Sequence, residues 1–255
     1  MPTDNRLSSL ALFLDVDGTL LDIAETPLSV RVDAGLNDLL RELLHSTGGA
    51  LALVSGRRIA EMDVLFAPLT LPAAGLHGFE RRDAAGCSHY GKLPSAVALE
   101  AVRGRMLELV AHRPGLLVED KRFALALHYR RAPELESLVV GAMAHIAESV
   151  RPEFELQLGK MVAELRPAGS TKGAALGQFM TEAPFRGRYP IYIGDDLTDE
   201  SAFEWINDAG GHSIAVNVGG PTAAQARLPS VGAVRLWLTQ LCESAGESLR
   251  RPPAP

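Results

Sequence analysis

Residues 10–20 read LALFLDVDGTL, and this stretch decides the fold class. The apolar run from Leu10 to Leu14 predicts a buried β-strand that ends at two carboxylates, Asp15 and Asp17, followed by a glycine. In an open α/β sheet, ligands bind beyond the carboxyl ends of the strands, which is where both acids fall. Two acids there can supply a nucleophile, a proton donor and oxygen ligands for a hard cation. The alternative is an ordinary turn rich in Asp and Gly.

Composition narrows the possible classes of protein. At 255 residues, the chain could form one large domain or two modest ones. A hydrophobic content of 47% against 22% charged is ordinary for a soluble globular protein, and no apolar run approaches the ~20 residues of a membrane span. The first residues lack a signal-peptide pattern, and two cysteines are too few for a disulfide framework, so we expect a cytoplasmic protein that does not bind membranes. The net charge of −6 argues against a nucleic-acid binder. The oligomeric state is not indicated, with a monomer slightly favoured.

Two further strands lead into candidate site residues. A helical pattern over residues 32–44 precedes a predicted strand over 50–54, which ends at Ser55-Gly56-Arg57 before a helix over 59–66. A hydroxyl at a strand end beside a helix N-terminus is a natural donor to a phosphate oxygen, although a helix N-cap is the alternative for Ser55. A third predicted strand over 71–78 ends in GLHGFE, whose glycines flank His77 and indicate a backbone that passes close to another group. An inconsequential loop histidine is the alternative.

The character of the chain changes from about residue 82 to residue 167. Helical patterns over 93–112 and 134–149 are each followed by two strand patterns, at 115–119 and 122–130, then at 153–158 and 160–166. This order predicts a separate α+β unit with helices on one face of its sheet. In the last strand Met161, Ala163 and Leu165 alternate with Lys160, Val162, Glu164 and Arg166. The second set would form a polar face, for which exposure to solvent is the usual explanation.

The alternating α/β pattern returns after residue 170. Lys172 begins a helical segment, where the helix dipole disfavours a cation, so a role beside a phosphate and Asp15 gains weight. A predicted strand over 189–193 ends in GDDLTDE, which places four acids in six positions. Such crowding of negative charge is costly unless a cation neutralises it, and oxygen ligands suit Mg²⁺. An acid-rich helix start is the alternative.

Four segments in order, DVDGT, SGR, Lys172 and GDDLTDE, resemble the motif series of the haloacid dehalogenase superfamily. The insertion between the second and third segments resembles the type IIB cap of that superfamily. More narrowly, GDDLTDE with Phe203 is similar to the GDDxTDExxF signature of trehalose-6-phosphate phosphatases, and residues 75–80 to their GxHGxE segment. Residues 119–121 with His128 and Arg130 resemble the ExK and HxR elements of that family, and residues 159–167 resemble its GKxxxExxP element.

The resemblance implies a fold and an activity. The fold would be a Rossmann-like α/β haloacid dehalogenase core with a parallel sheet, formed by residues 1–82 and 168–255, plus an inserted α+β type IIB cap over residues 83–167. The activity would be Mg²⁺-dependent hydrolysis of a small phosphosugar, trehalose 6-phosphate, to trehalose and phosphate through an aspartyl phosphate, in trehalose biosynthesis. The alternatives are another type IIB phosphatase, acting on sucrose phosphate, a mannosyl phosphoacid or hexose phosphates, and a non-catalytic phosphosugar sensor. The presence of both Asp15 and Asp17 counts against the sensor.

The resemblance also implies roles for individual residues. The catalytic set would be the nucleophile Asp15, the general acid/base Asp17, and Ser55 and Lys172 to hold the transferring group. Mg²⁺ would be bound by Asp15, the carbonyl of Asp17 and Asp195, while Asp196 and Asp199 would complete the metal site by orienting metal-bound waters. The substrate-binding set would comprise Gly18, Thr19, Gly56, Arg57, His77 and Gly78 in the core, and Glu119, Lys121, His128, Arg130, Lys160 and Glu164 in the cap.

Overall fold

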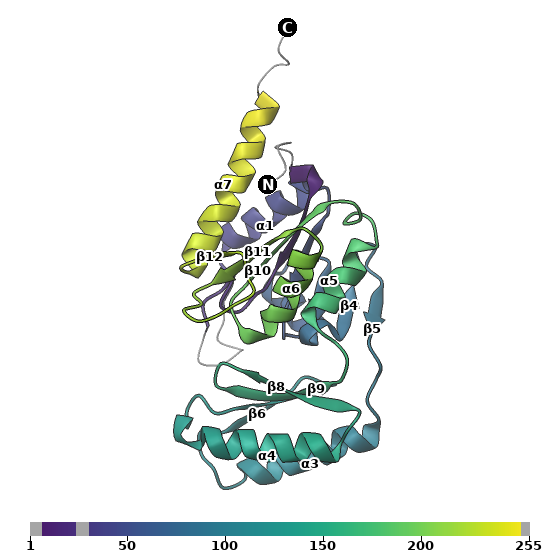
Figure 1. The fold of residues 1–255 in the computed structure, drawn as a ribbon, viewed down its shortest axis with the longest axis vertical. Coiled ribbons are helices and arrows are strands. Elements are labelled where there is room, and N and C mark those ends of the chain that lie inside the picture. Colours follow the sequence, from purple (N-terminus) through teal and green to yellow (C-terminus); the bar gives the residue numbers. More distant parts are fainter. Residues whose placement is uncertain (1–6, 24–30, 251–255) are drawn as a thin grey trace. The chain divides into compact units, whose positions relative to one another are not determined.

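The structure, a computed structural model, describes residues 7–23 and 31–250, with side chains as far as residue 243. Within these residues the chain divides into two units. The first contains the residues up to His89, then Thr171–Asp195, then those from Asp199 onward; the second contains Tyr90–Ser170 and Asp196–Thr198. Each unit has its own sheet, and several strands of both sheets are labelled in Figure 1.

The first unit is built on an eight-stranded sheet in the order β12-β11-β10-β1-β2-β3-β4-β5. Neighbouring strands from β12 to β3 are parallel, and β3 and β4 are antiparallel. The bounds are β1 Leu10–Leu14, β2 Leu51–Val54, β3 Ala73–Gly75, β4 Glu80–Arg82, β5 Ser88–Tyr90, β10 Tyr189–Gly194, β11 His212–Val216 and β12 Ala226–Leu228. Because β1 lies between β10 and β2, the carboxyl ends of these three strands share one edge at the middle of the sheet.

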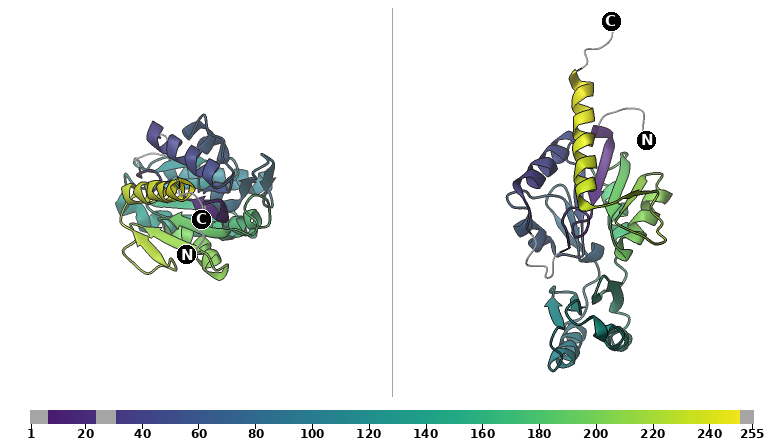
Figure 2. Two further views of the ribbon diagram at one scale, coloured as in Figure 1. Left: turned by 90° about the horizontal axis from the view of Figure 1, so that it is seen from above. Right: turned by 90° about the vertical axis from the view of Figure 1, so that its left-hand side faces the viewer.

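Helices cover both faces of this sheet, which buries the apolar residues of β1 on either side. Leu12 and Leu14 pack in a cluster with α1 and α7, whereas Ala11 and Phe13 pack on the opposite face with α5 and α6. All five β1 residues are buried, as expected for a strand of a parallel sheet covered on both sides. The helices are α1 Ala34–Ser46, α2 Ile59–Leu65, α5 Lys172–Met180, α6 Glu200–Asp208 and α7 Val231–Arg250. Figure 2 shows α7 beside α1, although they belong to opposite ends of the chain.

The third predicted strand is shorter than the apolar pattern indicated. β3 ends at Gly75 and is followed by a 3-10 turn, η3, over Leu76–Gly78. The φ angles of Leu76, His77 and Gly78 are 49°, 57° and 99°, so the backbone enters the left-handed region and the strand cannot continue. Three short strands, β4, β5 and β12, and the 3-10 turns η1 Leu7–Ser9, η4 Pro133–Leu135 and η5 Leu197–Asp199 also went unpredicted.

The second unit has a four-stranded antiparallel sheet in the order β6-β7-β9-β8. Its elements are α3 Ala96–Val110, β6 Leu117–Asp120, β7 Leu125–His128, α4 Glu136–Ser149, β8 Phe154–Gly159 and β9 Val162–Pro167. Leu125, Leu127, Ala163 and Leu165 form a core cluster with α3 and α4, which cover one face of the sheet (Figure 1). The predicted arrangement of two helices against one face of a small sheet is therefore observed.

The alternative of a solvated polar face does not hold at two positions of β9. Glu164 and Arg166 are only 4% and 7% exposed, and each is paired with a residue of the same unit. Lys121 contacts Glu164, and Glu155 contacts Arg166. Met161 does not belong to the strand either, since its φ of 62° places it in the turn between β8 and β9. Over the described parts of the chain, no helix combines the length and the apolar character needed to cross a membrane.

Candidate active site

A cluster of three buried carboxylates lies where β1 and β10 end. Asp15, Asp195 and Asp199 each offer an oxygen, and these oxygens lie within 4.8 Å of one another. Glycine makes this approach possible: Gly18 has a φ of +84°, and a Cβ there would stand 2.1 Å from Asp195 Oδ2. Oxygen ligands in such a group are those that hard divalent cations prefer, so the cluster could bind a metal ion.

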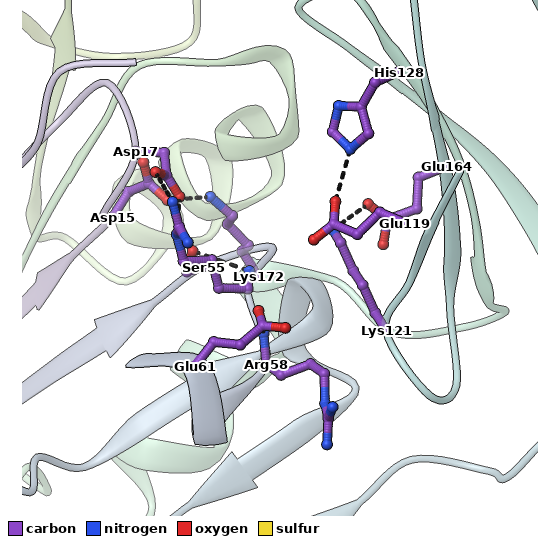
Figure 3. Close-up of polar contacts among 11 residues, drawn as sticks. Asp15, Asp17, Ser55, Arg58, Glu61, Glu119, Lys121, His128, Glu164 and Lys172 are labelled. Carbon is purple, nitrogen blue, oxygen red and sulfur yellow. Dashed lines mark hydrogen bonds and ion pairs between the residues drawn. The ribbon is translucent and has the colours of Figure 1, made fainter. Parts of the chain in front are cut away.

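Lys172 supplies the positive charge in this cluster. Its Nζ lies 2.8 Å from Asp15 Oδ1 (Figure 3). The same Nζ lies 2.5 Å from Asp199 Oδ1, and the lysine side chain is 2% exposed. It is the first residue of α5, whose N-cap Thr171 accepts a hydrogen bond from the Ala174 N–H. Burial alone would lower the pKa of Lys172, but the two carboxylates outweigh burial and raise it, so Lys172 stays charged.

Asp15 titrates far from its ordinary value. Burial raises the pKa of its carboxyl, the charge of Lys172 lowers it, and the charges of Asp199 and Asp195 raise it again, leaving it well above its usual range. The crowded acids therefore favour a proton or a cation at this point.

Asp199 is held by a residue that the sequence analysis missed. The hydroxyl of Tyr192, a fully buried residue of β10, donates to Asp199 Oδ1 over 2.5 Å, and the Asp195 N–H donates to Asp199 Oδ2 over 2.8 Å. With Lys172, Asp199 thus accepts three hydrogen bonds from the protein. A tyrosine two residues before the GDD sequence, among the apolar residues Ile191 and Ile193, was the signal available in the sequence.

The predicted general acid/base, Asp17, is paired with Arg57. The guanidinium binds in a fork: Nε lies 2.6 Å from Asp17 Oδ2 and Nη2 lies 2.6 Å from Asp17 Oδ1. The buried Ser55 at the end of β2 accepts a hydrogen bond from the Arg57 N–H over 3.2 Å. The sequence predicted all three as site residues but not the ion pair.

Residues 75–80 support the loop that carries Ser55 and Arg57. A Cβ on Gly56 would lie 2.7 Å from the His77 ring, and one on Gly78 would lie 2.4 Å from the Thr171 carbonyl oxygen. Side chains at these two positions would therefore collide with η3 and with the start of α5. Glu80, not predicted as a site residue, accepts the Ile59 N–H over 2.5 Å at the start of α2.

Two other predicted residues lie near the strand ends. Thr19 is fully buried, and its Oγ1 has no hydrogen-bond partner among the residues that the structure describes. Asp196 is half-buried, and its Oδ1 accepts the Leu197 N–H. It does not belong to the buried carboxylate cluster.

Four predicted residues of the second unit form a polar cluster on the sheet face opposite α3 and α4. The strand register aligns Glu119 with Ala126, and Ala126 with Glu164, in one row across the sheet. His128 Nε2 lies 2.7 Å from Glu119 Oε2, and Lys121 Nζ lies 2.7 Å from Glu164 Oε2 (Figure 3). Burial alone would raise the pKa of Glu119, but the His128 hydrogen bond and the Lys121 charge outweigh it and lower the pKa. We call Glu119, Lys121, His128 and Glu164 the sheet cluster.

Arg130 and Lys160 lie outside the sheet cluster. Both side chains are exposed, and Arg130 Nη2 donates to the Lys160 carbonyl oxygen over 3.3 Å. Most of the predicted residues thus lie in one group in each unit, whereas Arg130, Lys160 and Asp196, all in the second unit, lie outside these groups. The first unit contains Asp15, Asp17, Gly18, Thr19, Ser55, Gly56, Arg57, His77, Gly78, Lys172, Asp195 and Asp199.

The sequence matches the family model described as trehalose-phosphatase over residues 13–230. The trehalose-6-phosphate phosphatase of Escherichia coli (strain K12) is 42% identical over 239 residues, which are 94% of this chain and 89% of that protein. The probable trehalose-phosphate phosphatase of Sinorhizobium fredii (strain NBRC 101917 / NGR234) is 44% identical over 88% of this chain and 83% of that protein.

Solved structures show the same fold. The C-terminal domain of the C. albicans trehalose-6-phosphate phosphatase superposes with a TM-score of 0.82, at 23% identity, over 92% of each chain. The predicted α/β fold with a haloacid dehalogenase-like core is therefore confirmed.

Proposed function

The chain belongs to the trehalose-phosphatase family, and on this premise we propose that it hydrolyses trehalose 6-phosphate to trehalose and phosphate. The observation that carries the proposal is the buried contact of Lys172 with Asp15 beside Asp195 and Asp199. This arrangement holds a carboxylate, a fixed cation and further oxygen ligands where two neighbouring strands end, which is what phosphoryl transfer requires.

Asp15 is the nucleophile in this proposal. One of its carboxylate oxygens attacks phosphorus, the bond from phosphorus to the sugar oxygen breaks, and an aspartyl phosphate forms. Lys172, which lies 2.8 Å from Asp15 Oδ1, keeps the carboxylate in place and offsets the charge of the incoming phosphate. The Ser55 hydroxyl, buried at the end of β2, donates a hydrogen bond to the transferring group.

Asp17 moves the protons. In the first step it donates a proton to the departing sugar oxygen, which would otherwise leave as an unstable alkoxide. In the second step it accepts a proton from the water that attacks the phosphorus of the aspartyl phosphate, and this attack releases phosphate and restores Asp15. Its partial exposure, 35% of the side chain, leaves it accessible to both groups.

The residues present fit a divalent cation. The raised pKa of Asp15 and the close approach of three carboxylates mark a place where a cation would relieve charge crowding. Asp15, Asp195 and the Asp17 carbonyl would hold Mg²⁺, with Asp196 and Asp199 outside them. Asp199 suits that outer role because Lys172, Tyr192 and the Asp195 N–H already bind its oxygens. When bound, the ion would reduce repulsion between the nucleophile and the phosphate.

The second unit serves as the cap that selects the sugar. The sheet cluster offers two carboxylates, an ammonium and an imidazole on one sheet face, a set suited to hydrogen bonds with sugar hydroxyls. Arg130 and Lys160, which are exposed, would contribute at its margin. A site built around such bonds rejects substrates that lack the hydroxyls.

A panel of phosphate esters with released phosphate as the readout tests the proposal. We expect the highest kcat/KM for trehalose 6-phosphate, above sucrose phosphate and hexose phosphates. A higher kcat/KM for one of the other sugars would assign the chain to another substrate. Saturable binding of trehalose 6-phosphate without phosphate release under Mg²⁺ would identify a phosphosugar sensor instead.

A further inference from the structure

The ion pair between Arg57 and Asp17 joins two loops that follow neighbouring strands. Asp17 comes after β1 and Arg57 after β2, and these strands pair in parallel. The backbone of Arg57 is fixed on both sides, since its N–H donates to Ser55 Oγ over 3.2 Å and its carbonyl accepts the Leu76 N–H over 3.0 Å. The guanidinium therefore projects from an anchored point, and it binds Asp17 through two hydrogen bonds of 2.6 Å.

A fork of this kind fixes the orientation of a carboxylate more strictly than a single contact does. A carboxylate has about four lone-pair sites, so two donors of one guanidinium leave each oxygen with a site for a further hydrogen bond. Arg57 can thus set the plane of the Asp17 carboxylate while a carboxylate oxygen remains able to exchange a proton with substrate.

We infer that Arg57 is a positioning residue for the general acid/base, acting on the reaction through Asp17 rather than through the phosphate alone. The inference rests on the proposed function, because it assigns Asp17 the proton transfers of that reaction. It also differs from the role that the family resemblance implies for Arg57, which is binding of substrate.

The nature of the leaving group separates these two roles. A sugar oxygen needs a proton as it departs, whereas nitrophenolate leaves readily without one. Loss of a phosphate-binding group weakens both substrates alike. Loss of the correct orientation of Asp17 slows the sugar ester selectively in kcat/KM, which reports the steps up to the first bond cleavage.

The experiment compares Arg57→Gln and Arg57→Lys with the wild type on trehalose 6-phosphate and on p-nitrophenyl phosphate. We expect kcat/KM for trehalose 6-phosphate to fall ~10- to 100-fold, part of the usual contribution of general acid catalysis, and kcat/KM for the aryl ester to change by less than about 3-fold. Arg57→Lys keeps the positive charge but cannot form the forked pair of hydrogen bonds, so its kcat/KM for trehalose 6-phosphate should be little higher than that of Arg57→Gln. Equal losses on both substrates, with weaker inhibition by inorganic phosphate, would overturn the inference in favour of a phosphate-binding role.

Arg58→Gln is the matched control. Arg58 is the next residue, its backbone N–H donates to Glu61 over 3.1 Å, and its side chain extends away from Asp17 in Figure 3. This variant should retain wild-type kcat/KM on both substrates. Thermal unfolding of all variants shows whether any loss of activity comes from a loss of folded protein.

A double-mutant cycle supplies a second test. If Arg57 acts through Asp17, Arg57→Gln should change single-turnover hydrolysis of trehalose 6-phosphate by less than about 3-fold in an Asp17→Asn background, because the group that it orients is already lost. An undiminished effect in that background would overturn the inference. Wild-type protein that hydrolyses p-nitrophenyl phosphate and a hexose phosphate but not trehalose 6-phosphate would refute the proposed function alone. The leaving-group comparison would then use the hexose phosphate.

Discussion

The Nζ of Lys172 lies 2.8 Å from the Oδ1 of Asp15, although 157 positions separate the two residues in the chain. Both side chains are almost fully buried, so water cannot solvate either charge if its partner is removed. Removing Lys172 would leave the buried Asp15 beside Asp195 and Asp199 without a compensating cation, whereas removing Asp15 leaves Lys172 its contact with Asp199. The nucleophile therefore depends on the lysine in stability as well as in chemistry.

Asp15→Asn should abolish turnover. An amide is a poor nucleophile, so we expect kcat to fall by ~10⁴-fold or more. Acid-quenched protein incubated with ³²P-labelled substrate should carry no label. The control is Asp38→Asn, which changes an exposed acid of α1 and should leave both measurements at wild-type values. Near-wild-type turnover in Asp15→Asn under saturating Mg²⁺ would exclude the covalent mechanism.

Removal of divalent cations should abolish activity and lower the thermal stability. A ligand that binds only the folded state stabilises it by about 2.7 kcal/mol at 100 times its Kd, so Mg²⁺ should raise Tm by several degrees. Asp195→Asn should lose this rise, since it removes one of the three clustered carboxylates. Excess Ca²⁺ should inhibit, because it prefers more ligands and looser geometry. Full activity after exhaustive chelation would contradict the prediction.

Tyr192→Phe should lower both stability and kcat. The change removes the hydroxyl that donates to Asp199 and keeps the ring that packs against Phe203. A hydrogen bond to a charged group contributes about 1.5–3 kcal/mol, so urea unfolding should show a loss of that size. Tyr189→Phe, at the start of the same strand, is the control and should change neither quantity. Unaltered stability in Tyr192→Phe would mean that Lys172 and the Asp195 N–H are sufficient to hold Asp199 without the tyrosine hydroxyl.

Glu164→Ala should separate the sugar substrate from a small aryl phosphate. We expect kcat/KM for trehalose 6-phosphate to fall ~10²-fold or more, about 3 kcal/mol in the transition state, with little change for the aryl ester. The substitution also leaves Lys121 buried without its 2.7 Å partner, which costs stability. Glu164→Gln retains an acceptor for Lys121 and is therefore the companion variant. Equal losses on both substrates in both variants would point to misfolding or to a chemical defect.

The sheet cluster should make stability depend on pH in the acid range. The pKa of Glu119 is lowered from 4.5 in the folded protein, so its carboxylate stabilises the fold at pH values above the unfolded pKa. That contribution is lost as the pH falls through the folded pKa. Urea unfolding of the wild type and of Glu119→Gln between about pH 6 and pH 3 checks this. The wild type should lose more stability than the variant on acidification, and parallel curves would disprove the assignment.

The strands that carry the acids could be predicted because each is a short apolar run that stops at a carboxylate. β1 and β10 are such runs, and the parallel sheet brings their carboxyl ends together. The left-handed turn that begins at Leu76 could not be predicted, because a leucine rarely adopts a positive φ.

Contacts between side chains that are far apart in the sequence could not be predicted either. The separation of Asp17 and Arg57 in the sequence does not indicate that they form an ion pair across two loops. Likewise, the sequence around Tyr192 did not indicate which residue accepts the hydrogen bond of its hydroxyl. Alternation in β9 identified which residues share a face. Alternation alone could not decide whether that face is exposed to solvent or covered, and the structure shows Glu164 buried.

The position of β1 between β2 and β10 sets an order of events during synthesis of the protein. β2 follows β1 closely, but β10 begins only at Tyr189, after all the strands of the second unit. At a synthesis rate of ~5–20 residues per second, one edge of β1 stays unpaired for on the order of ten seconds before β10 has been made. The antiparallel sheet of the second unit can form during that interval. A chain that ends before residue 189 therefore contains the complete second sheet together with an apolar strand, β1, that has one unpaired edge. Such an edge is a template for aggregation, and chaperones must shield it.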